Sequence, residues 1–214
     1  MSQPLALFPL QIVVFPGEKV PLHIFEMRYR ELLKDCEEQN MTFGIPTYIK
    51  GKLGYGSEVS LHKVAKRYDS GELDVICRAS RVFRITSFHN PLPGKLYSGG
   101  DVVFLENIDD GVDSQRIRVI DLIEELYKLI GVGFQALSVE GFRSYDLAHK
   151  IGLNLEQEYH LLQLERESER LRYVERHLKK VIPIIEQVNT TKKLIQMNGH
   201  FRNFDPLDFK DFKL

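Results

Sequence analysis

Residues 5–29 read LALFPLQIVVFPGEKVPLHIFEMRY, and the rest of the chain is organised around this stretch. Pro16 and Gly17 predict a tight corner, because Pro presets φ at the first corner position of a type II turn and Gly tolerates positive φ at the second. Pro21 keeps the residue before it extended. The expected order is a short strand at 5–7, a break at Pro9, an apolar run at 12–15, the corner, an extended piece at 20–24 and a helix.

That helix is expected to begin at Phe25 and Glu26. Its apolar residues recur at helical spacing and form one stripe, made of Phe25, Tyr29, Leu32, Leu33 and Cys36. The stripe predicts that one face of the helix, Phe25 included, packs on the two strands. Strand, corner, strand and helix would then form one local folding unit.

The following residues, up to Gly111, are expected to be mostly strands. Extended segments are predicted at 41–49, 57–68, 73–88 and 96–108. The connections between them carry Gly, Pro or Asp and are expected at 51–56, 69–71 and 90–94. The second segment drifts or bulges, and the third is expected to kink at 78–81. Many short strands with one early helix indicate a mostly antiparallel sheet or a partly closed barrel.

From Asp113 the apolar period changes to that of a helix. Asp113 or Ser114 is expected to cap the N-terminus of a helix that ends near residue 130, because Gly131 stands where a C-cap belongs. Ser144 is expected to start a short helix that ends at Gly152.

Two further helices are predicted in the second half. Asn154 and Gln157 form a capping-box pattern for a helix that runs through Leu164. A long last helix begins near Ser168, with a three-four apolar repeat, and Pro183 should kink it or end its first half. The fold class is therefore α+β, with a β-rich domain at 1–111, a helical domain at 112–198 and an aromatic C-terminal tail at 199–214.

The string LFPLQIVVFPGEKVPLHIFEMRYRELLKDC, residues 7–36, resembles the start of the LON substrate-binding domain of ATP-dependent Lon proteases, above all its stand-alone bacterial form. Weaker similarity continues to about residue 197. The residues that carry the motif are Phe15, Pro16, Gly17, Pro21, Leu22, Phe25, Glu26, Arg28 and Tyr29. The resemblance implies a small barrel similar to PUA folds. Because Pro, Gly and buried apolar residues mostly fix backbone and packing, we expect these residues to build the fold and not to contact a ligand.

Composition excludes several classes of protein. The net charge of −1 gives no general attraction to nucleic acid or to an anionic membrane. We find no secretory signal and no apolar run near the ~20 residues that span a bilayer. Cys36 and Cys77 lie far apart and form no disulfide framework. A soluble, cytoplasmic protein without a membrane partner is expected.

Motifs for catalysis and for cofactors are missing from the sequence. It has no GxxxxGK[ST] segment for ATP, no HExxH or GxSxG motif, and no Ser-Lys protease module that could be carried over from Lon. We therefore expect no catalytic residue, no metal and no cofactor. Nucleic-acid binding is not expected, because Arg78, Arg81 and Arg84 would scatter over both faces of a strand.

The leading hypothesis is a non-catalytic module that binds unfolded or apolar polypeptide segments at a groove or a sheet edge. Candidate contact residues are loop aromatics, namely Tyr48, Tyr55, Tyr68 and Tyr97. A protease, a chaperone or a second copy of the chain are further candidate partners. Two alternatives stay open: a hydrolase with an unrecognised site, and a PUA-like module that binds RNA.

Overall fold

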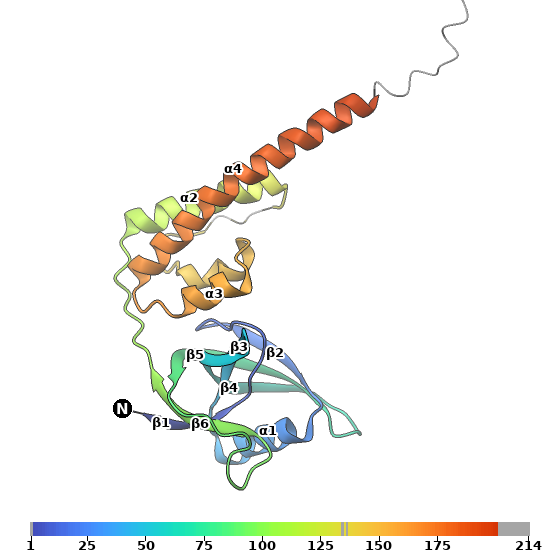
Figure 1. Cartoon of the computed structure of the whole chain (residues 1–214), viewed down its shortest axis with the longest axis vertical. Coiled ribbons are helices and arrows are strands. Elements are labelled where there is room, and N and C mark those ends of the chain that lie inside the picture. The colour runs from blue at the N-terminus through green and yellow to red at the C-terminus, as the bar shows by residue number, and fades with distance from the viewer. Residues whose placement is uncertain (1, 134, 136, 201–214) are drawn as a thin grey trace, which may run out of the picture.

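The strands and the first helix lie at one end of the molecule, and the remaining helices lie at the other (Figure 1). The structure is a computed structural model that describes residues 2–133, 135 and 137–200. Its elements are β1 (Gln3–Leu7), β2 (Lys19–Ile24), α1 (Met27–Gln39), β3 (Phe43–Ile49), β4 (Lys52–Arg67), β5 (Leu73–Ile85), β6 (Ser98–Phe104), α2 (Asp113–Ile130), the 3₁₀ helix η1 (Ser144–Lys150), α3 (Leu155–Leu162) and α4 (Glu167–His200).

Five strands close into a barrel in the order β5-β4-β3-β1-β6, because β6 also pairs with β5. β2 pairs with the edge of β5 that does not contact β4, and its residues 19–24 run antiparallel to residues 73–78 of β5. The pairing of β1 with β3 is parallel and the other strand pairs are antiparallel, so the barrel is mixed. The predicted α+β fold with a barrel and a long last helix is confirmed.

The Pro16–Gly17 corner forms as the sequence predicts. Gly17 has a φ of +91°, and the N–H of Glu18 donates to the carbonyl oxygen of Phe15 at 3.1 Å, which closes a type II turn. The apolar run before the corner is not a regular strand. Its side chains divide between two cores: Val14 packs in the barrel, whereas Val13 and Phe15 pack with the helices. This run therefore joins the two ends of the molecule.

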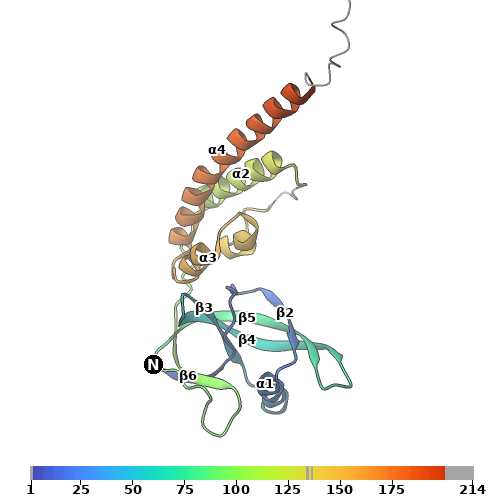
Figure 2. The same cartoon turned by 45° about the vertical axis from the view of Figure 1, so that its right-hand side comes forward.

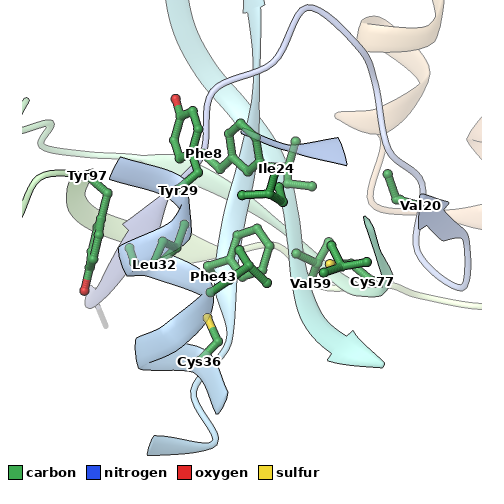
Figure 3. Packing of buried hydrophobic residues seen from close by; sticks show 14 of the residues in the cluster. Phe8, Val20, Ile24, Tyr29, Leu32, Cys36, Phe43, Val59, Cys77 and Tyr97 are labelled. Carbon is green, nitrogen blue, oxygen red and sulfur yellow. The ribbon is translucent and has the colours of Figure 1, made fainter. Parts of the chain in front are cut away.

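Phe25 does not belong to the buried stripe of α1, which corrects the prediction. The helix begins at Met27 after Glu26, and 58% of Phe25 is exposed. The reason is the strand period: Phe25 follows buried Ile24 in an extended chain, so it points to the opposite side. The rest of the stripe is buried, and Figure 3 shows Tyr29, Leu32 and Cys36 among the side chains of the barrel core.

The glycine-rich segment is strand where a loop was expected. The turn is confined to Lys50 and Gly51, and β4 starts at Lys52. Gly56 lies against β3 so closely that a Cβ atom on it would be 2.3 Å from the carbonyl oxygen of Ile45. Gly here permits the close approach of two backbones, not a flexible connection.

β5 is continuous where a kink was expected at 78–81. The pairing of β4 with β5 shifts register between Ser57 and Val59, where two residues of β5, Ser80 and Arg81, stand opposite the single residue Glu58. Glu58 accepts hydrogen bonds from both side chains, at 3.0 Å from Ser80 Oγ and 2.7 Å from Arg81 Nε. A β-bulge, stabilised by this buried carboxylate, is present instead of the expected kink.

The helices of the second half match the sequence except at some ends. Gly131 has a φ of +71° and ends α2, but the N-cap is Val112, so the expected caps Asp113 and Ser114 are wrong. Asn154 and Gln157 form the predicted capping box. The predicted helix at 144–152 is a 3₁₀ helix that ends at Lys150, and α3 ends at Leu162.

α4 does not end at Pro183 but continues to His200. It runs alongside α2 and extends beyond it in both views (Figures 1 and 2). Its buried residues, Leu171, Val174, Leu178 and Ile182, pack against those of α2. Most of the predicted aromatic tail, from residue 201 on, lies outside the described residues. In the described part of the chain, no helix combines the length and the apolarity that a membrane crossing needs.

Candidate functional site

An open apolar cavity of about 460 Å³ lies beside the barrel. Its walls come from β1, from β6, from Met41 just before β3, and from the loop 86–97 between β5 and β6. The lining residues are Pro4, Leu5, Ala6, Met41, His89, Leu92, Pro93, Tyr97, Gly100 and Asp101. We call this cavity the β1–β6 groove. Its volume falls within the usual range for ligand sites, about 300–1,000 Å³.

The loop 86–97 is fixed against β6. The backbones of His89 and Gly99 exchange two hydrogen bonds, of 2.8 and 3.0 Å, and the N–H of Leu92 donates to the carbonyl oxygen of Tyr97 at 2.8 Å. The peptide bond between Asn90 and Pro91 is cis. Because of the three hydrogen bonds, the loop presents Leu92 and Pro93 to the groove from a fixed backbone.

Gly100 permits the close approach of this loop. A Cβ atom on Gly100 would lie 2.0 Å from the carbonyl oxygen of Ser87, which is far inside van der Waals contact. Gly99 is less crowded, since its Cβ would lie 3.0 Å from Leu92 Cδ1. A side chain at position 100 would push the loop from the barrel and deform the groove.

Tyr97 forms the inner wall of the groove, and the residue is only 2% exposed. Its hydroxyl donates to Asp35 Oδ2 at 2.6 Å, and Lys95 Nζ donates to the same oxygen at 2.5 Å. The hydrogen bonds from Lys95 and Tyr97 hold the pKa of Asp35 below its ordinary value, while burial raises the pKa of Tyr97. Asp35 on α1 thus fixes the ring from behind, so the wall exists before any ligand binds.

The polar groups at the groove do not form a catalytic arrangement. Ser87 Oγ donates directly to Asp101 Oδ2 at 2.8 Å. The ring of His89 makes no hydrogen bond with another described residue, so it does not lie between the hydroxyl and the carboxylate as a general base would. Within the described residues, no group of three or more His, Cys, Asp or Glu side chains could hold a metal ion. The polar groups at the groove can therefore provide contacts to a ligand.

The structure does not bring the four candidate tyrosines together. Tyr97 lines the groove. Tyr55 faces α3, where its backbone N–H donates to Tyr159 Oη at 2.9 Å. Tyr68 lies just after β4, and its hydroxyl donates to Asp74 Oδ2 at 2.7 Å. Tyr48 lies near the end of β3 and is 48% exposed. These four residues therefore do not define one site.

The residues of the sequence motif lie away from the groove. Phe15 stacks on Tyr145 of η1 with 4.9 Å between ring centroids, and Tyr29 stacks on Phe8 in the barrel core at 3.7 Å. Arg28 covers the Tyr29 ring and forms an ion pair with Glu26 at 2.7 Å. Pro21 and Leu22 belong to β2. These contacts are those of residues that build the fold.

Sequence reasoning missed most of the groove. Met41, His89, Leu92 and Pro93 were read only as parts of connections or strand ends. The available signal was a loop with two prolines and apolar residues next to the Gly99–Gly100 pair, which indicates a loop packed closely on a strand. The remaining walls come from residues 4–6 and 41, and only closure of the barrel brings them to that loop.

A second cavity, of about 390 Å³, lies between the Pro16–Gly17 corner and η1. His149 bridges two carboxylates there: Nδ1 is 2.8 Å from Glu158 Oε1 and Nε2 is 3.2 Å from Glu18 Oε2. The hydrogen bond with Glu18 raises the pKa of His149 to about 9, although burial opposes this, so the imidazole is charged at neutral pH. This bridge ties the barrel to the helices. We take the β1–β6 groove as the candidate site because its lining is mainly apolar.

The chain thus combines a closed mixed barrel, an apolar groove beside it and a set of helices that packs on one end of it. Residues 4–180 match the model of the ATP-dependent protease La (LON) substrate-binding domain. The chain belongs to this family.

Solved structures of the same fold agree with this assignment. A Lon N-terminal domain protein from Xanthomonas campestris is 28% identical, with a TM-score of 0.63 over 79% of this chain and 95% of its own. The N-terminal domain of the Mycobacterium avium complex Lon protease is 14% identical, with a TM-score of 0.60 over 83% of this chain and 98% of its own, and shows the fold alone. A comparison with curated proteins gave no match.

Proposed function

We propose that this chain is a non-catalytic recognition module that binds apolar segments of unfolded polypeptides in the β1–β6 groove. The observation that carries the proposal is the groove itself, with walls of Leu5, Ala6, Leu92, Pro93 and the fixed Tyr97 ring. Burying a Leu or Phe side chain in such a cavity is worth about 1.5–3 kcal/mol. The name of the family, a substrate-binding domain, supports a polypeptide as the occupant.

The setting of this activity is part of the proposal. A bound polypeptide would be passed to a separate protease or chaperone, as the link of the family to an ATP-dependent protease suggests. Cys36 and Cys77 are buried and free, and burial raises the pKa of both thiols to about 12. Unpaired thiols support a reducing, cytoplasmic compartment.

A peptide titration with a matched pair of variants tests the proposal. Leu92→Ala removes apolar wall from the groove, whereas Leu96→Ala makes the same change in the same loop at a side chain that is 57% exposed and does not line the groove. We expect Leu92→Ala to weaken the binding of a fluorescent apolar peptide about tenfold, from the loss of roughly 1.4 kcal/mol of apolar contact. Leu96→Ala should bind as the unaltered chain does.

Two kinds of result would contradict the proposal, one in binding and one in activity. One is the absence of peptide binding by the unaltered chain, or equal binding by both variants when circular dichroism shows that both are folded. The other is cleavage of labelled casein, with or without ATP, by the purified chain. Cleavage would favour the hydrolase alternative and require a nucleophile that the groove does not show.

A further inference from the structure

One carboxylate, that of Asp101, lines the groove, and a second, that of Glu31, lies against the neighbouring loop. Asp101 lines it from β6 and accepts a hydrogen bond from Ser87 Oγ at 2.8 Å. Glu31 of α1 reaches the loop 86–97, where it accepts the N–H of Leu96 at 2.8 Å. Neither carboxylate forms an ion pair with a residue in the described part of the chain. The negative charge of Asp101 is therefore free, within the described residues, to act on a ligand, whereas the charge of Glu31 also raises the pKa of Lys95.

The neighbouring lysines are already paired. Lys95 Nζ is 2.5 Å from Asp35 Oδ2, and Lys34 Nζ is 3.8 Å from Glu38 Oε1. Lys95 compensates Asp35 and also lies in the field of Glu31, and neither lysine forms an ion pair with Asp101. An occupant of the groove meets a surplus of negative charge that these lysines do not cancel.

We propose that the groove selects apolar segments that carry Lys or Arg beside their apolar side chains. This inference rests on the proposed function and specifies its ligand class. The apolar side chains fill the cavity between Leu92 and Tyr97, and the adjacent cation lies within the field of Asp101. At physiological salt that field extends about 8 Å, so a flanking residue of the ligand feels it. The same charges repel a segment flanked by Asp or Glu.

The test compares three fluorescent peptides with one apolar core, flanked by Lys, by Ser or by Glu, titrated against the full chain by anisotropy. We expect the Lys-flanked peptide to bind about fivefold more tightly than the Ser-flanked one at low salt, and the Glu-flanked peptide to bind more weakly, with both differences shrinking at high salt. A difference in affinity that shrinks at high salt comes from charge, whereas one that persists comes from direct contact.

Asp101→Asn removes one charge while its side-chain oxygen can still accept the hydrogen bond from Ser87. We expect it to bring the affinities of the Lys-flanked and Glu-flanked peptides closer together by a factor of about two to three. Asp69→Asn is the matched control, because Asp69 is exposed in the turn between β4 and β5 and does not line the groove. It should leave the three affinities as they are.

The outcomes separate this inference from the proposed function. Equal binding of the three peptides, or an equal effect of Asp101→Asn and Asp69→Asn, would overturn the charge preference and leave polypeptide binding standing. Preference for the Glu-flanked peptide would also overturn it. If none of the three peptides binds, the proposed function itself is wrong and the inference goes with it.

Discussion

Gly100 is a position at which the structure has no room for a side chain. It stands in β6 where the loop 86–97 returns across the strand, and the carbonyl oxygen of Ser87 occupies the space that a side chain would need. The neighbouring contacts are backbone atoms, which cannot turn away as a flexible side chain can. The shape of the groove thus depends on one residue without a Cβ.

Gly100→Ala tests this dependence. The Cβ would lie 2.0 Å from the carbonyl oxygen of Ser87, so the loop must move, and we expect the free energy of unfolding to fall by about 2 kcal/mol or more. Denaturant unfolding gives the change in stability and a peptide titration gives the loss of binding. Gly133→Ala, whose added Cβ would have no described atom within 4 Å apart from those of its chain neighbours, should change stability by less than about 0.5 kcal/mol. If the two variants are equally stable, the loop is not held as described.

The connection between β6 and α2 is held to α4 by a buried ion pair. Arg170 is 2% exposed and Glu167 is fully buried. Arg170 Nε donates to Glu167 Oε2 at 2.8 Å, and another guanidinium nitrogen donates to Asn107 Oδ1 at 2.7 Å. Glu167 also accepts the N–H and the hydroxyl of Ser144. One pair therefore fixes the connection, η1 and the start of α4 together.

Arg170→Met should be costly because it leaves the Glu167 carboxylate buried without its cation. We expect the free energy of unfolding to fall by about 3–5 kcal/mol, and a second change, Glu167→Gln, to restore part of that loss. Denaturant unfolding measures both. Arg172→Met, two positions further along α4 and exposed, is the control. A loss no greater in Arg170→Met than in Arg172→Met would show that the pair does not hold this connection.

The elements that the sequence predicts well are those whose signals are local. The type II turn at Pro16–Gly17, the capping box at Asn154 and the end of α2 at Gly131 each depend on neighbouring residues. Phe25 was assigned to the buried stripe because its position fits both a helical and an extended spacing. The helix begins only at Met27, so the extended spacing applies and Phe25 points outward. The groove could not be predicted, since its walls meet only after strands distant in sequence pair.

At the scale of the whole molecule, the barrel and the helices are joined by side chains from both. Val13, Phe15 and Val82 come from the barrel end of the chain but pack in the helical core. The bridge from Glu18 through His149 to Glu158 adds a charged link over the same contact. The division at residue 111 remains a prediction about folding units, and these contacts show that the two parts share a core.

The His149 bridge makes this link sensitive to pH in a defined direction. The hydrogen bond with Glu18 raises the pKa of His149 from 6.5 to about 9 in the folded chain. Its contribution to stability is therefore full below about pH 6.5 and is lost as pH rises through about 9. Although burial raises the pKa of Glu18, its hydrogen bond with His149 leaves it below the ordinary value, so Glu18 contributes above about pH 4.5.

Comparison of the unaltered chain with His149→Gln isolates this effect from other titrations. We expect the stability difference between them to be largest near pH 6 and to disappear by about pH 10, as followed by denaturant unfolding across that range. His62→Gln, an exposed change on β4, should give a small difference that does not vary with pH in this way. A difference for His149→Gln that persists at pH 10 would mean that packing on Phe15, whose ring centroid is 4.9 Å from that of His149, and not charge, makes the link.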